Sequence, residues 1–290
     1  MKKNNGVILI LTSAIFYATY GIWSRIMGSA FGEFSQAWSR GLMLLITVFL
    51  INWKLKIFKP IQKQDLPWLI TIGLAGGLNQ APYYFGFQNL SIGTATLLFY
   101  TGLVIGGFIL GKVFFKENIT LIKIISLILA MTGMILIYKF QLIPKQFLAA
   151  TLTIVAGLLG SITVILPRKL IGGYHEFQIM VSYFLSQIFF NGILSYLFKD
   201  SLPPITNIVP WLGQIAYAVA LILANWAAIE GYRQYDAGLG SLIGLAEIIF
   251  GVIFGVIIFH EVLSTGIIIG SLVIVFAAAL PHIIRGHKTE

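Results

Sequence analysis

The stretch AGLGSLIGLAEIIFGVIFGVIIF, residues 237–259, contains a single charged residue, Glu247, which stands near its middle. A helix of this length rises about 1.5 Å per residue, which is enough to cross the ~30 Å hydrocarbon core of a bilayer. Four glycines share one helical stripe with the glutamate: Gly240, Gly244, Gly251 and Gly255. Because small residues permit close helix approach, this stripe is predicted to face other helices rather than lipid.

The rest of the chain has the same character. Of its 290 residues, 58% are hydrophobic and only 10% are charged, whereas soluble domains carry about 25% charged residues. So few charges cannot cover the surface of a soluble globule, and the sequence predicts an all-α membrane protein that contacts the lipid bilayer. Ten apolar segments are long enough to span it: 6–28, 34–53, 67–88, 91–112, 119–138, 146–166, 176–198, 208–230, 237–259 and 262–284.

Basic residues are distributed unevenly between the predicted loops. If the N-terminus is cytoplasmic, fourteen of the 19 Lys and Arg residues fall on the cytoplasmic side. Arg40 falls within the second span, and four residues fall outside: Arg25, Lys139, Lys145 and Lys199. Since basic loops stay in the cytoplasm, both termini are expected there, in a multi-pass protein of the cell (inner) membrane. The net charge of +9 therefore reflects topology, and no nucleic-acid partner is expected.

The two halves of the chain, residues 1–143 and 144–290, share a weak internal repeat at offsets of 143 to 145 residues. Four stretches correspond: Ser24-Arg25 with Pro167-Arg168, Leu90–Ala95 with Tyr235–Gly240, Gly107-x-x-x-Gly111 with Gly251-x-x-x-Gly255, and Phe115-Lys116-Glu117 with Phe259-His260-Glu261. Each half has five predicted spans, an odd number, so the halves are expected to insert in opposite orientations. Inverted repeats are typical of alternating-access transporters, whose substrate site lies near the midplane.

The chain resembles the drug/metabolite transporter superfamily, in the form with two EamA-like domains. Four features carry the resemblance: the ten-span plan, the glycine-containing turn between the third and fourth spans, the glycine-rich fourth and ninth spans, and the glutamates at the ends of those two spans. The resemblance covers nearly the whole chain. It implies two inverted five-helix repeats around a central cavity, and export or exchange of small metabolites by secondary active transport. It does not select one substrate, and amino acids are the first expectation.

Two charged residues are candidates for the transport site. A carboxylate at the membrane midplane is costly unless it faces a cavity or a partner. Glu247 is therefore expected to couple transport to protons, to contact a cationic substrate group, or to be a protonated structural carboxyl. Arg40 has three open interpretations: it attracts an anionic substrate group, pairs with Glu247, or extends to the outer interface.

The stretch Asn79-Gln80-Ala81-Pro82-Tyr83 interrupts the third span, because proline removes a backbone hydrogen bond. Interrupted spans point to binding sites, so Asn79 and Gln80 are substrate-binding candidates. Gln80 corresponds to Asn225 in the second half, although interhelical amide bonding explains this pair equally well. The tyrosines Tyr17, Tyr83 and Tyr100 complete the set of substrate-binding candidates, together with Trp226. Trp226 lies deep in its span, where it either stacks on a substrate or, as the favoured alternative, only packs against other helices.

Other function classes fit the sequence less well. The chain has no cysteine, its four histidines lie in or near loops or span ends, and it contains no Walker-type phosphate loop. Enzymatic activity, a metal or other cofactor and an ATP-driven mechanism are therefore not expected. A non-transporting scaffold or accessory subunit and a channel remain as alternatives, with an intramembrane enzyme as a less favoured one. Both a monomer and a homodimer stay open. Glu117 and Glu261 are interpreted as structural residues on opposite sides of the membrane.

Overall fold

The computed structural model describes residues 2–286, which fold into helices joined by short loops with no β-strand among them. Nine helical segments within this range are long and apolar enough to span a membrane. A tenth segment, residues 66–89, is divided at Asn79 into two shorter helices. The all-helical class and the ten predicted segments are therefore confirmed. Lys288, one of the basic residues assigned to the cytoplasmic side, lies outside the described residues.

Three of the ten segments are interrupted: the first is α1 (Lys2–Ala18) and α2 (Tyr20–Met27), the third is α4 (Leu66–Leu78) and α5 (Gln80–Asn89), and the ninth is α11 (Ala237–Gly244) and α12 (Ala246–Phe259). The other seven are continuous: α3 (Glu33–Lys54), α6 (Ile92–Phe115), α7 (Leu121–Tyr138), α8 (Phe147–Ile165), α9 (Glu176–Leu197), α10 (Ile208–Gln234) and α13 (Thr265–Gly286). Two 3₁₀ turns flank α8: η1 (Pro144–Gln146) and η2 (Leu166–Lys169).

The interruptions have local causes. Pro82 has no N–H to bond the carbonyl of Leu78, and α4 gives way to α5 at the next residue, Asn79, as the sequence predicts. The ninth span turns more tightly at Leu245, whose N–H donates to the carbonyl of Leu242 at 3.2 Å. This second break was not predicted from the sequence. It creates a new helix N-terminus beside Glu247, which is the second residue of α12.

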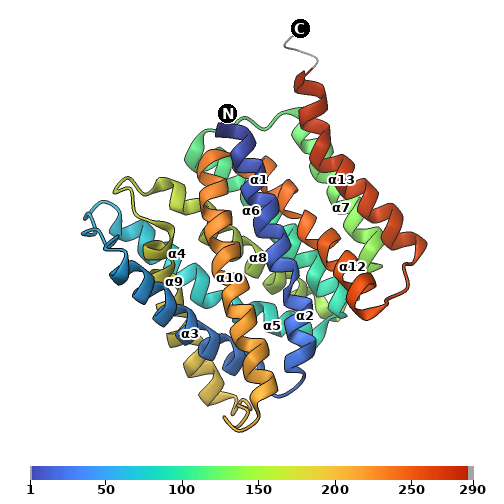
Figure 1. Ribbon diagram of the computed structural model, residues 1–290. Helices are drawn as coiled ribbons and strands as arrows, with labels where there is room; N and C mark the ends of the chain where they lie inside the picture. The colour runs from blue at the N-terminus through green and yellow to red at the C-terminus, as the bar shows by residue number, and fades with distance from the viewer. Residues whose placement is uncertain (1, 287–290) are drawn as a thin grey trace.

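Figure 1 shows how the helices are grouped. On one side of the bundle α7 packs against α13, and on the other side α9 packs against both α3 and α4. Between them α1 packs on α10, while α6 contacts α8 and α11. The first turn of α1 and the last turn of α13 lie at the same end of the molecule, which is called the termini end below.

The pairing of α6 with α8 depends on two glycines. A methyl group at Gly157 of α8 would overlap the carbonyl oxygen of Phe99, and one at Gly102 of α6 would overlap the carbonyl oxygen of Ile154. Both obstacles are backbone atoms, which cannot rotate away as a side chain can. The two helix backbones therefore touch directly, as small residues permit in membrane bundles.

Because of this contact, we expect Gly157→Ala to lower the free energy of unfolding by about 1–3 kcal/mol, the usual effect of overpacking. Gly192→Ala in α9 is the matched control, since nothing lies within 4 Å of its added methyl group. Tryptophan-fluorescence melting in detergent would compare the two variants. Equal melting temperatures would contradict the direct backbone contact between α6 and α8.

Candidate functional site

A cavity of about 560 Å³ lies among the three interrupted spans and α3, α6, α8, α9 and α10. Its volume falls within the ~300–1,000 Å³ typical of small-molecule sites. Eight of the nine residues predicted from the sequence line it: Tyr17, Arg40, Asn79, Gln80, Tyr83, Tyr100, Asn225 and Glu247. The ninth, Trp226, does not line the cavity and instead packs against the buried core.

Arg40 lies on α3, where its side chain is 6% exposed and lines the cavity. Its guanidinium carbon lies over the Tyr217 ring, 4.6 Å from the centroid, and its Nη1 donates a long hydrogen bond of 3.3 Å to Gln36 Oε1. Its Nε is buried without a partner. Among the described residues no carboxylate oxygen lies within 4.0 Å of it. In this structure Arg40 therefore neither pairs with Glu247 nor extends to the interface. Of the three interpretations from the sequence, attraction of an anionic substrate group is the one that this geometry leaves.

Glu247 occupies the first turn of α12, just after the break at Leu245. The first N–H groups of a helix lack partners within that helix, and the helix dipole favours a carboxylate there. Tyr100 is the neighbouring tyrosine of this carboxylate, and both side chains line the cavity. Within residues 2–286 no basic side chain forms an ion pair with Glu247. Arg40 and Glu247 thus line one cavity, together with a second carboxylate, Glu33, and Arg40 forms an ion pair with neither glutamate.

The two amides that correspond in the repeat both line the cavity, but they are used differently. Asn225 accepts a hydrogen bond of 2.9 Å from the Tyr17 hydroxyl through Oδ1, which joins α10 to α1. Its Nδ2 donates to the carbonyl of Leu221 at 2.8 Å. Gln80 donates through Nε2 to Glu33 Oε1, which joins α5 to α3. Both amides therefore bond between helices while their side chains still border the cavity.

Glu33 is a cavity residue that sequence reasoning missed. It is the first residue of α3 and lines the cavity together with Gln80. An acidic residue in the first turn of a helix is common, because the helix dipole favours it. The only signal in the sequence was its spacing from Arg40, seven residues later, which places both on one helical face.

The two ends of the cavity differ in exposure. At the end away from the termini, Ile92 is 73% exposed and Tyr20 is 37% exposed. At the termini end, Tyr232 and Val164 are only 4% and 8% exposed. The cavity is therefore open at the end away from the termini and closed at the termini end.

Comparison with known proteins supports the same architecture. Residues 4–139 match the model of the EamA-like transporter family. An uncharacterized transporter of Clostridium kluyveri is 24% identical, with 97% of this chain and 94% of that protein covered. An uncharacterized membrane protein of Saccharomyces cerevisiae is 22% identical, with 100% of this chain and 78% of that protein covered.

A solved crystal structure has the same fold, with a TM-score of 0.82 at 13% identity over 96% of this chain and 98% of that one. At this level of identity the likeness concerns the fold alone. The family match and the transporter-named relative of similar length agree with the spans and the polar cavity. The chain is therefore an integral membrane protein whose residues 4–139 match the EamA-like transporter family and whose fold is that of the solved structure.

Proposed function

We propose that the chain is a secondary active transporter that exports or exchanges small metabolites, such as amino acids, by alternating access. The observation that carries this proposal is a membrane-embedded cavity holding a buried cation, Arg40, and a carboxylate, Glu247, that do not pair with each other. A buried charge without a partner is strongly unfavourable. A cavity that keeps such a cation beside a partly buried carboxylate with no basic partner among the described residues is suited to a ligand that supplies the missing partners.

Arg40 is proposed to bind a carboxylate of the substrate. A guanidinium offers donors in a planar fork that matches a carboxylate, and its unpartnered Nε is one of them. The Tyr217 ring beneath it keeps the guanidinium plane in place. Asn79, Gln80, Asn225 and the tyrosines Tyr17, Tyr83 and Tyr100 would surround the remainder of the substrate with amide and aromatic surface.

Glu247 is proposed to couple transport to protons or to hold a cationic substrate group. In an alternating-access cycle its carboxylate would meet water from each side in turn. It would then exchange a proton at one side and a substrate group at the other. The chain has no Walker-type phosphate loop, so an ion or solute gradient is the proposed energy source.

The two halves, residues 1–143 and 144–290, are proposed to be inverted repeats. Corresponding contacts at the two ends of the molecule support this proposal. Arg25 pairs with Glu261, and its guanidinium lies 4.1 Å from the centroid of the Phe259 ring. Arg168 likewise pairs with Glu117 and lies 4.4 Å from the centroid of Phe115. Every residue of the first cluster has its counterpart in the second at an offset of 143 or 144.

Both termini are proposed to lie in the cytoplasm, in the cell (inner) membrane. The basic loops support this orientation, since 14 of 19 Lys and Arg residues then fall on the cytoplasmic side. With this orientation the cavity opens toward the outside.

We expect water to reach the middle of the cavity. Ser13 lines it and Ser126 of α7 does not, although both are buried, at 4% and 0% exposure. Because the chain has no cysteine, each Ser→Cys variant carries a single thiol. A small charged thiol reagent should modify Ser13→Cys at least roughly tenfold faster than Ser126→Cys, since reaction requires access and a thiolate. Equal rates in the folded protein would contradict a water-filled cavity.

The transport proposal is tested in proteoliposomes against a mixed pool of amino acids and related metabolites. Arg40→Gln should lower the transport of carboxylate-bearing solutes by at least about tenfold, because it removes one partner of a desolvated charge pair. Glu247→Gln should abolish the dependence of transport on a pH gradient. Lys139→Gln is the control for loss of a charge, since Lys139 is exposed and does not line the cavity.

Each outcome bears on a separate part of the proposal. Solute movement that depends equally on the pH gradient in Glu247→Gln and in the wild type would make Glu247 a structural carboxyl. Unchanged transport in Arg40→Gln would remove the proposed carboxylate site. A folded wild-type protein that moves nothing from a broad pool would favour the scaffold or accessory-subunit alternative.

A further inference from the structure

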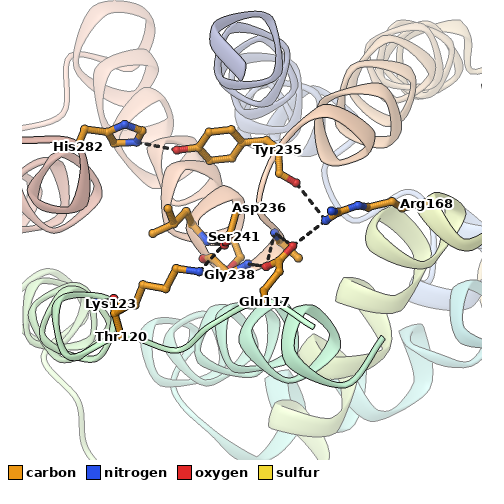
Figure 2. Close-up of polar contacts among 11 residues, drawn as sticks. Glu117, Thr120, Lys123, Arg168, Tyr235, Asp236, Gly238, Ser241 and His282 are labelled. Atoms are coloured by element: carbon orange, nitrogen blue, oxygen red, sulfur yellow. Dashed lines mark hydrogen bonds and ion pairs between the residues drawn. The ribbon is translucent and has the colours of Figure 1, made fainter. Parts of the chain in front are cut away.

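A polar network closes the bundle at the termini end. Figure 2 shows Glu117, from the loop between α6 and α7, facing the first turn of α11. Its two carboxylate oxygens accept the N–H of Ala237 at 3.0 and 2.9 Å, and Oε2 also accepts the N–H of Gly238 at 3.5 Å. Arg168, from η2, donates through Nη1 to Glu117 Oε1 at 2.6 Å. Glu117 thus docks on a helix N-terminus whose N–H groups have no partner within the helix.

Neighbouring residues extend this network to two further helices. Asp236 caps α11 by accepting the Leu239 N–H at 2.9 Å, and it pairs with the buried Lys123 of α7 at 2.6 Å. The Tyr235 hydroxyl lies 2.7 Å from His282 Nε2 of α13. Burial raises the pKa of the Glu117 carboxyl. Burial acts in the same direction on Asp236, but the hydrogen bond from Lys123 outweighs it, so the pKa of Asp236 is lowered. The contacts join the first half of the chain to the second directly beneath the closed end of the cavity.

A corresponding arginine–glutamate pair lies at the opposite end of the molecule, where its side chains are more exposed. Glu261 is the counterpart of Glu117 and pairs with Arg25, the counterpart of Arg168. The side chains of Arg25 and Glu261 are 53% and 46% exposed, whereas those of Arg168 and Glu117 are 30% and 11% exposed. Among the described residues, Arg25 is the one hydrogen-bond donor to the Glu261 side chain.

The partner that Glu261 lacks can be named from the repeat. Ala237 and Gly238, which bind Glu117, correspond at an offset of 145 to Ile92 and Gly93. These two residues begin α6, and Ile92 is 73% exposed beside the open mouth of the cavity. The Ser91 side chain caps the N–H of Thr94, and no side chain within residues 2–286 accepts from the N–H groups of Ile92 and Gly93. An equivalent docking position for Glu261 is therefore vacant.

We propose that Glu117 and Glu261 are the two gates of the transporter, each closing one end by docking its carboxylate on a helix N-terminus. Glu117 on α11 closes the termini end, as in this structure, and Glu261 on α6 closes the opposite end when Glu117 is released. This inference rests on the proposed function and its inverted repeat. It revises the interpretation of both glutamates as purely structural.

The two closed ends use the same chemistry, so exchanging one for the other costs little free energy. Each release exposes a carboxylate and two N–H groups to water, and each docking removes an equivalent set from water at the other end. The difference between the two states is therefore small compared with either contact alone, which is the condition for a bistable switch. The extra Lys123–Asp236 pair has no charged counterpart, since Lys123 corresponds to Ile267 and Asp236 to Ser91, and it favours the state seen here.

The test measures distances between spin labels attached to introduced cysteines. Because the chain has no cysteine of its own, only the introduced positions are labelled. One label pair, Asn118→Cys with Gln234→Cys, spans the gate at the termini end. The pair at the corresponding positions, Val262→Cys with Asn89→Cys, spans the gate at the opposite end. In the wild type the termini-end pair should be short and the opposite pair long. These distances are read in proteoliposomes without any substrate.

Glu117→Gln should increase the population with an open termini end by about tenfold, because a charge-assisted contact is replaced by a neutral one. The opposite end should close in the same fraction of molecules. Glu117→Asp, which keeps the charge, should restore part of the wild-type distribution. Glu261→Gln is the matched variant and should only reinforce the state with a closed termini end.

Unchanged distances in a folded Glu117→Gln protein would overturn the proposal, as would opening of the termini end without closure of the other. If one end opens and the other closes as expected but no solute moves in the transport assay, the proposal about the two glutamates is retained and the proposed transport function is wrong. If solute moves but the distances do not respond to either glutamate, the transporter is retained and these gates are wrong.

Discussion

The hydrocarbon interior of a bilayer offers no hydrogen-bonding partner, so every backbone N–H and C=O at that depth must find one inside the protein. Continuous helices satisfy this requirement by themselves, and seven of the ten segments here are of that kind. The three interrupted segments meet it differently, because their breaks at Thr19, Asn79 and Leu245 lie beside the polar cavity rather than against lipid. The helix breaks and the polar cavity therefore lie together, because both require a place where backbone groups are not exposed to lipid.

Charge obeys a related rule. Lys123 and Asp236 neutralise each other, as do Arg168 and Glu117, and these pairs hold helices together at the termini end. Arg40 and Glu247 differ, since neither has an oppositely charged partner within 4.0 Å among the described residues. Removing an ion from water without a partner costs several kcal/mol. The fold tolerates this cost only inside the cavity, where water or a ligand can approach.

The fold is retained in a solved structure that is only 13% identical, at a TM-score of 0.82. This is understandable, because lipid-facing positions require apolar character but not particular side chains. Close packing constrains a few positions more tightly, such as Gly102 and Gly157, where any side chain would overlap the backbone of the neighbouring helix. The polar side chains that line the cavity, such as Asn79 and Glu247, are not held by such a backbone contact. Fold alone therefore does not determine which substrate the site binds.

The sequence by itself determined the ten helical segments, because length and hydropathy are properties of each segment alone. It also indicated most of the cavity: polar residues within apolar spans, such as Gln80, Asn225 and Glu247, are unfavourable in lipid and therefore lie inward. Tertiary structure decided what depends on neighbours. It left Arg40 without a carboxylate partner, placed Trp226 against the core and broke the ninth helix at Leu245. It also buried Glu117 on α11 while exposing Glu261, although their local sequences correspond. Such differences arise from which helix lies opposite, and no periodicity along a single chain contains that information.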